Sequence, residues 1–107
     1  MASEARFQKK IIDWAKGEGY HAMKIPADVE IGVPDLELFR GNRHIRIEVK
    51  SETGKIRETQ LGWADRHPDE LVLYIKPSEF NDYKNIIGII LDYYPDEEKT
   101  KQWLKNQ

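Results

Sequence analysis

Two short apolar strands joined by Gly41-Asn42 constrain the fold of this chain more than any other feature of its sequence. Residues 44–50 alternate strictly between polar and apolar side chains, a period of two that is typical of a half-buried strand. Glycine and asparagine both tolerate positive φ, so Gly41-Asn42 suits a two-residue hairpin loop. This tight loop pairs Arg40 with Arg43, and all remaining residue pairs between the two strands follow from that pair. A longer turn would shift the register of the strands.

In this register the hairpin has one apolar face and one charged face. On the charged face Glu37 meets Arg46 and Asp35 meets Glu48, while Lys50 lies two residues beyond Glu48 on the same side. Directly opposed residues have Cβ atoms roughly 4.5–5.5 Å apart, which suits two carboxylates that share one ion. The apolar face holds Leu36, Leu38, Ile45, Ile47 and Val49.

The opposed acids Asp35 and Glu48 suggest a metal site. Two carboxylates side by side repel each other unless a positive charge lies between them, and a divalent cation is the natural candidate. Charged alternation on a hairpin is more often a plain solvated face, and Glu37 with Arg46 fits that reading. Gly32 and Pro34, however, fix the backbone directly before Asp35. We therefore expect metal-assisted hydrolysis of a phosphodiester, with Lys50 beside the metal.

The length predicts one domain that spans residues 1–107, and the order of its expected helices and strands makes it an α/β domain. Hydrophobic residues make up 39% and charged residues 34% of the chain, as in soluble globular proteins. The absence of cysteine excludes disulfides and thiolate zinc sites. No apolar run reaches the length of a membrane span and no hydrophobic signal core begins the chain, so we expect no membrane partner, no export and a cytoplasmic location.

The charge of the chain is skewed toward the predicted hairpin. The net charge of −2 argues against a protein that coats polyanions without specificity. Residues 40–67 nevertheless hold seven Lys or Arg against four Asp or Glu, whereas from residue 68 onward there are five against eight. We expect the basic residues near the acids to face a nucleic-acid backbone. The candidates for DNA contact are Arg43, Arg46, Lys55 and Arg57.

The remaining patterns predict helices on either side of a mixed central sheet, in the order α-β-β-β-α-β followed by a helical C-terminus. The segment after Ser78 reads as a helix through Tyr94, although its β-branched stretch leaves a strand over residues 86–91 open. A last helix is expected from Pro95, with Trp103 and Leu104 as its apolar part. The other expected elements are a helix over 3–18, a strand over 20–25, the hairpin over 35–50, a helix over 56–67 and a strand over 71–76.

An ordered set of motifs in this chain resembles a nuclease family. Gly32-Val33-Pro34-Asp35, then Glu48-Val49-Lys50, then Gly54 and Gln60 look like the motifs of the PD-(D/E)xK nuclease superfamily. More narrowly they resemble the VRR-NUC group, the virus-type replication-repair nucleases, whose opening helix is also similar to residues 4–16. The likeness covers about residues 3–76 and implies a restriction-endonuclease-like core.

The resemblance implies a role for each motif residue. Asp35 and Glu48 would bind Mg²⁺ or Mn²⁺, helped by the backbone carbonyl of Val49, and Glu4 would complete the metal site directly or through water. Lys50 would position the attacking water and stabilise charge on the phosphate. The side chain that would orient Lys50 or a water bound to the metal is Gln60.

The resemblance also implies a substrate and an assembly. Small stand-alone members are typically homodimers that cut branched DNA such as the four-way Holliday junction, which places this chain in DNA repair in a bacterial or phage-infected host cell. Members fused to other domains act on flaps. A flap, nicking or restriction-type nuclease of the same fold therefore stays open. A catalytically silent DNA-binding module and a plain structural domain are the alternatives without catalysis.

Overall fold

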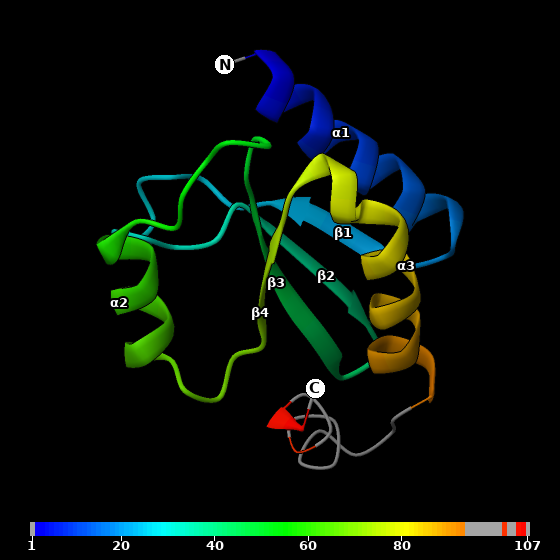
Figure 1. The fold of residues 1–107 in the computed structure, drawn as a ribbon. Coiled ribbons are helices and arrows are strands. Elements are labelled where there is room, and N and C mark those ends of the chain that lie inside the picture. The colour runs from blue at the N-terminus through cyan, green and yellow to red at the C-terminus, as the bar shows by residue number, and fades with distance from the viewer. Residues whose placement is uncertain (1, 94–101, 103–104, 107) are drawn as a thin grey trace.

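The computed structural model describes residues 2–93, 102, 105 and 106, and it confirms a mixed α/β fold (Figure 1). Residues 80–93 are helical, so the alternative strand over 86–91 is wrong, and the helix changes to π-helical geometry over its last turn. The terminal helix expected from Pro95 lies outside the described residues, as do Trp103 and Leu104. The elements are α1 (Ala2–Gly17), β1 (His21–Lys24), β2 (Leu36–Arg40), β3 (Arg43–Val49), α2 (Glu58–Arg66), β4 (Val72–Ile75), the 3₁₀ turn η1 (Pro77–Glu79), α3 (Phe80–Gly88) and the π-helical turn η2 (Ile89–Tyr93).

The four strands form one mixed sheet in the order β1-β2-β3-β4. β2 pairs with β1 and with β3 in antiparallel fashion, whereas β4 runs parallel to β3. The register predicted for the hairpin is confirmed, because Arg40 pairs with Arg43 and Leu38 with Ile45. Each apolar residue of β3 therefore points to the same side of the sheet as its apolar partner on β2.

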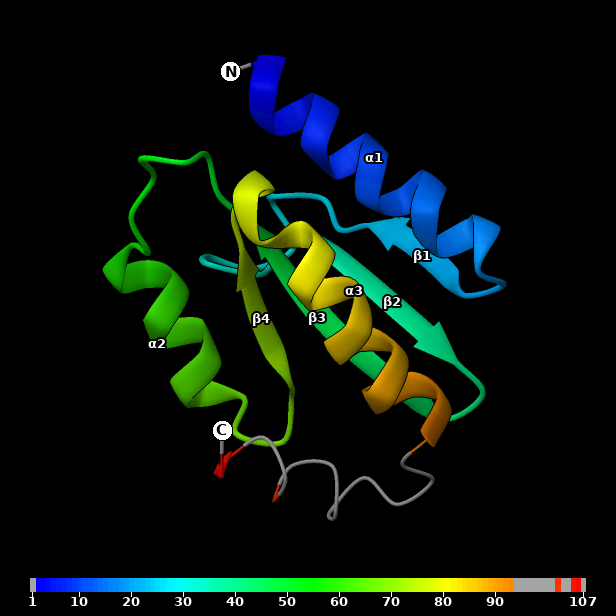
Figure 2. The ribbon, with the colours of Figure 1, turned by 45° about the vertical axis from the view of Figure 1, so that its right-hand side comes forward.

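α1 and α3 cover the apolar face of this sheet (Figure 2). α1 contributes Phe7 and Ile11 to the core, and α3 contributes Phe80 and Ile87, all of them buried. The rings of Phe7 and Phe80 meet edge to face with centroids 5.5 Å apart, a favoured geometry for an aromatic pair. Leu36, Leu38, Ile45 and Ile47 of the hairpin are fully buried beneath these helices.

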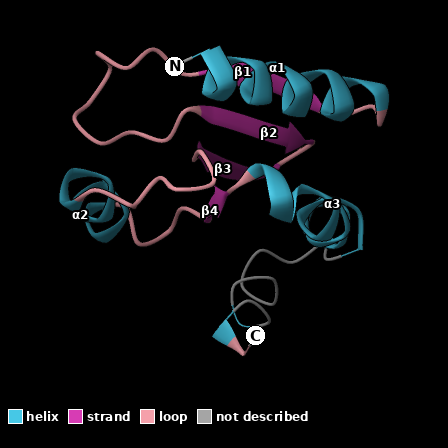
Figure 3. Cartoon of the chain, turned by 45° about the horizontal axis from the view of Figure 1, so that its top comes forward, coloured by secondary structure: helices cyan, strands magenta, loops and turns pink. Residues whose placement is uncertain are grey.

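α2 covers part of the charged face, on the other side of β4 from α3 (Figure 3). Its Trp63 is only 3% exposed, and the guanidinium of Arg46 lies 5.5 Å from the centre of the indole ring. The chain therefore has three layers, with α1 and α3 on one face of the sheet and α2 on the other.

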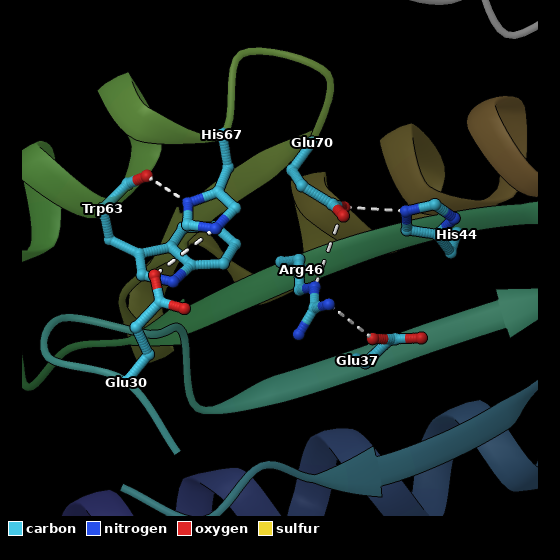
Figure 4. Close-up of polar contacts among 7 residues, drawn as sticks. All are labelled: Glu30, Glu37, His44, Arg46, Trp63, His67 and Glu70. Carbon is cyan, nitrogen blue, oxygen red and sulfur yellow. Dashed lines mark hydrogen bonds and ion pairs between the residues drawn. The ribbon is translucent and has the colours of Figure 1, made fainter. Parts of the chain in front are cut away.

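A polar network fills the space between α2 and the charged face (Figure 4). Arg46 lies between two carboxylates, 3.2 Å from Glu37 and 3.7 Å from Glu70. Glu70 is also 2.7 Å from the Nε2 atom of His44. The Arg46 guanidinium therefore has carboxylate partners, as a half-buried charge requires.

The loop that precedes β2 is fastened to α2. Arg66 donates to the carbonyl of Ile31 at 3.2 Å, and the Nε2 atom of His67 lies 3.3 Å from Glu30. Gly32 adopts a φ of +82°, and a Cβ atom there would lie 2.0 Å from the carbonyl oxygen of Thr59 on α2. The loop and α2 therefore touch backbone to backbone, which only glycine allows.

We predict that Gly32→Ala destabilises the protein far more than Gly41→Ala. Both glycines have positive φ, at +82° and +62°, but nothing lies within 4 Å of a Cβ at Gly41. Gly41→Ala should cost about 1 kcal/mol from backbone strain alone, whereas the added clash at Gly32 should bring the loss above about 3 kcal/mol. Urea denaturation measures both free energies of unfolding, and equal losses would show that the loop does not touch α2.

Candidate functional site

The predicted site residues gather at one end of the sheet. The carboxyl ends of β3 and β4 lie at this end, together with the start of β2 and the amino end of α1 (Figures 1 and 2). Because β2 runs antiparallel to β3, the residue before β2 reaches the same end as the last residues of β3. The hairpin thus brings Asp35 to Glu48, as its register predicts.

The carboxyl groups of Asp35 and Glu48 are in direct contact. Asp35 lies directly before β2, where its carbonyl accepts a hydrogen bond of 2.7 Å from the amide of Ile25. Its Oδ2 atom accepts a second one of 2.9 Å from the amide of Val49. A side-chain hydrogen bond joins its carboxyl to that of Glu48. Hydrogen bonds from the amides of Ile25 and Val49 therefore hold Asp35 in place beside Glu48.

Glu48 is a much weaker acid than an ordinary glutamate. Its side chain is only 5% exposed, and this burial, followed by the hydrogen bond and the charge of Asp35, raises its pKa to about 8. The charge of Glu4 raises the pKa further, which places the amino end of α1 near the pair. The Lys50 ammonium, 3.9 Å from the Glu48 carboxyl, lowers the pKa without reversing the shift. The two acids therefore share a proton more readily than separate carboxyls do.

The acid pair fits a divalent cation that binds oxygen. Mg²⁺ keeps several waters and needs only one or two carboxylates from the protein. Among the described residues, no group of three or more His, Asp or Glu side chains is arranged to hold a metal ion. The two carboxyls that meet, Asp35 and Glu48, would be the principal ligands of a cation bound here. Glu4 is half-buried on α1, and its charge acts on Glu48, so a role of Glu4 at a bound cation would run through water. A cation at the pair would take the place of the shared proton.

Lys50 is held in place by α2. It is 7% exposed, and its Nζ atom donates a hydrogen bond of 2.6 Å to the Oε1 atom of Gln60. The same oxygen accepts a bond of 2.9 Å from the backbone N–H of Arg57, at the start of α2. Gln60 therefore links the Lys50 ammonium to the first turn of α2. Within the described part of the chain, Glu48 and Lys50 are the two charged side chains that are buried.

The four predicted DNA contacts divide into two groups. Lys55 and Arg57 are exposed on the loop between β3 and α2, directly after Lys50. Arg43 opens β3 at the opposite end of the strand from the acid pair. Arg46 is close to Glu48 in sequence, but its guanidinium is held by Glu37 and Glu70 above Trp63. Of these four residues, Lys55 and Arg57 are the two that face solvent beside the site.

The structure adds residues that sequence reasoning missed. Tyr74 of β4 pairs with Glu48, and burial raises the pKa of its phenol, with the charges of Glu48 and Asp65 adding to the shift. A groove of about 380 Å³ opens beside it. The strongly apolar run over 71–76 predicts a strand, but no local signal says which strand it joins or in which register. The groove is lined by Lys50, Gly54, Lys55, Ile56, Tyr74, Lys76 and Glu79.

A larger hollow of about 520 Å³ lies elsewhere, between the end of α1 and α3. Two of its polar side chains already bind each other, because the Tyr20 hydroxyl donates to Asp92 at 2.6 Å. Arg40, which does not line the hollow, donates to the same carboxylate at 2.5 Å. Burial, together with Asp92, raises the pKa of Tyr20 to about 12. This hollow contains none of the motif residues, so its size does not make it the site.

No family model, curated protein or solved structure matches this chain. Among the residues that the structure describes, no helix is both long and apolar enough to cross a membrane. A functional conclusion therefore depends on the arrangement of the residues themselves.

We predict that Glu48→Gln stabilises the metal-free protein, and increasingly so as the pH rises. The folded pKa of about 8 lies above the ordinary value of 4.5, so the folded state binds the proton more tightly than the unfolded state. The wild type therefore loses stability between these two pKa values as the pH rises, whereas a glutamine there does not titrate. Between about pH 5.5 and 8.5 the advantage of the variant should grow by on the order of 2–3 kcal/mol.

Urea denaturation in EDTA at the two pH values measures this advantage. The matched control is Asp13→Asn, which removes an exposed carboxylate that pairs with Lys9 at 2.7 Å. Its effect should stay within about 0.5 kcal/mol. An advantage of Glu48→Gln that does not change with pH would mean that Glu48 is ionised in the folded protein.

Proposed function

We propose that this chain is a metal-dependent DNA endonuclease with a PD-(D/E)xK-type active site. The observation that carries the proposal is the burial of one acid and one base, Glu48 and Lys50, beside a second acid, Asp35. Buried charges destabilise a fold unless they are fully paired. Here two carboxyls meet, which is a costly arrangement for structure alone. It is a suitable one for holding a cation next to an ammonium group.

The residue types match the needs of phosphodiester hydrolysis. A bound Mg²⁺ or Mn²⁺ would act as a Lewis acid on the phosphoryl oxygens and lower the pKa of a bound water. Asp35 and Glu48 would hold the cation, and the carbonyl of Val49 and the carboxylate of Glu4 would be further oxygen ligands. These ligands would come from α1, from the residue directly before β2 and from the end of β3.

Lys50 and Gln60 supply the remaining groups. The Lys50 ammonium orients the attacking water and stabilises negative charge on the phosphate. Gln60 is a positioning residue, because its Oε1 atom binds the Lys50 Nζ atom at 2.6 Å and α2 holds it in turn. Lys55 and Arg57, exposed on the following loop, are placed to contact the DNA backbone.

The proposed substrate is branched DNA, and the proposed active form is a homodimer. A four-way junction has two equivalent strands to cut, which a symmetric pair of sites can reach together. A flap or nicking nuclease keeps the same chemistry with a single site. A restriction-type enzyme also keeps it, whereas a silent DNA-binding module would leave the acid pair without a use.

We expect Asp35→Asn to abolish cleavage and leave the fold intact. The asparagine Oδ1 atom can still accept the 2.9 Å hydrogen bond from Val49, but the negative charge for the cation is lost. The assay is cleavage of labelled four-way junction, flap, linear duplex and single strand, each with Mg²⁺, Mn²⁺ or EDTA. The control is Glu37→Gln, which changes an acid of the same strand face that pairs with Arg46 at 3.2 Å and should retain activity.

Each outcome of this assay has a distinct meaning. Symmetric metal-dependent cuts on the junction, from a protein that sediments at twice the chain mass, would support the homodimeric form. Metal-dependent cutting of another substrate by a monomer would support the flap or nicking form. Binding without cleavage of any substrate, or full activity of Asp35→Asn, would contradict the proposal.

We further expect Lys50→Gln and Gln60→Ala to slow turnover to different degrees. Lys50→Gln removes a group that acts on the reacting atoms and should lower kcat by about 10²–10⁴-fold. Gln60→Ala only releases that group, so it should lower kcat less, shift the pH profile and leave KM nearly unchanged. Metal affinity, measured by calorimetry, should survive both changes. An unchanged pH profile in Gln60→Ala would contradict a positioning role.

A further inference from the structure

The groove beside Lys50 is not used by the chemistry proposed above. It lies between the loop that follows β3 and the end of β4, and it has a volume of about 380 Å³. Small-molecule sites occupy roughly 300–1,000 Å³, so the groove has room for one small ligand. Its walls include Lys50 itself, so any ligand bound there would lie next to the proposed reacting phosphate.

Hydrogen bonds fix both walls of the groove. Glu52, on the loop, accepts bonds from the amide and the hydroxyl of Ser78 at 2.5 and 2.8 Å, which tie the loop to the chain after β4. The far end of the same loop is bound through Arg57 to Gln60. The amide of Lys50 donates to the carbonyl of Ile75 at 2.9 Å and joins the two walls at their base. The groove therefore exists before a ligand arrives.

The lining combines positive charge with flat apolar surface. Lys50, Lys55 and Lys76 bring three ammonium groups, against the single carboxylate of Glu79. That carboxylate is already engaged, because its Oε1 atom accepts a 3.1 Å bond from the backbone N–H of Lys76. The apolar surface comes from the Tyr74 ring and from Ile56, which is 41% exposed. A ligand that fits both parts has an anionic group and a planar or apolar group.

We infer that this groove receives an unpaired nucleotide next to the scissile phosphate. Its phosphate binds between Lys55 and Lys76, and its base or sugar packs on Tyr74 and Ile56. Stacking on an aromatic ring requires a base with an exposed face, and the groove holds one nucleotide and not a base pair. The inference rests on the proposed nuclease function and refines its substrate class. The substrate is DNA with an unpaired nucleotide at the cut, such as a flap, a gap or an open branch point.

The test begins with nucleotide binding to the metal-free protein. Titration of dTMP and dAMP in EDTA, followed by NMR of the backbone amides, should shift Gly54, Ile56 and Lys76, and inorganic phosphate or thymidine alone should bind more weakly. Lys76→Gln should weaken binding of dTMP about tenfold, the loss of one charge-assisted contact, and Ile56→Ser should weaken it as well. The matched control is Lys16→Gln, which removes an exposed lysine in the last turn of α1, far from the groove.

The second measurement is cleavage of a flap and of an uninterrupted duplex by the same variants. Lys76→Gln should raise KM for the flap by about tenfold and change kcat little, and the wild type should prefer the flap. Cleavage by a protein that does not bind dTMP, or whose KM is insensitive to Lys76→Gln, would overturn the inference and leave the nuclease proposal in place. Binding of dTMP with no cleavage of any DNA would overturn both the nuclease proposal and the position assigned to this nucleotide.

Discussion

The register of the β2–β3 hairpin is the constraint on which the rest of this structure depends. Gly41 takes the positive φ of the turn, and Arg40 pairs with Arg43 across it. A slip of one residue would turn every side chain of a strand to the opposite face. Glu48 and Lys50 would then point into the apolar core beneath α1 and α3. The two-residue turn thus separates the core from the site along the whole hairpin.

Two polar clusters share the charged face of the sheet, and they differ in which groups are placed together. In the first cluster the Arg46 guanidinium has two carboxylates of opposite charge, Glu37 at 3.2 Å and Glu70 at 3.7 Å. In the second cluster one acid, Glu48, lies against another acid, Asp35, and its pKa is raised to about 8. The first arrangement is that of a structural ion pair. The second places two like groups together, as is common where a protein gives up stability for function.

Sequence reasoning predicted the local parts of the fold and missed those that depend on distant contacts. The hairpin and its acid pair follow from a turn and an alternating pattern within residues 35–50. Counting residues outward from the turn was therefore sufficient to predict which residues pair. The position of Tyr74 beside Glu48 depends on how β4 joins β3 in parallel, which no short pattern encodes. The engagement of Arg46 depends likewise on Glu70, a residue that follows α2.

The helical segments show the same division between local and distant information. α1 and α2 begin and end within about two residues of their expected limits, because an apolar stripe marks the first helix and Pro68 follows the second. The sequence left residues 86–91 open between helix and strand, since β-branched residues favour strands. The helix is favoured because it buries Ile87, Ile90 and Leu91 against the sheet. Which face each helix would cover was not readable from its own residues.

The contact of Gly32 with Thr59 also determines where this chain can change in length. From Glu30 to Asp35 the backbone is a tether of fixed length, fastened to α2 at Glu30, Ile31 and Gly32 and to β3 at Asp35. Residues 26–29 form an exposed turn closed by the Val29 amide on the Pro26 carbonyl. Extra residues in that turn would extend into solvent, whereas one extra residue in the tether would move Asp35 away from Glu48. A natural or engineered insertion near the site would therefore be tolerated before Glu30.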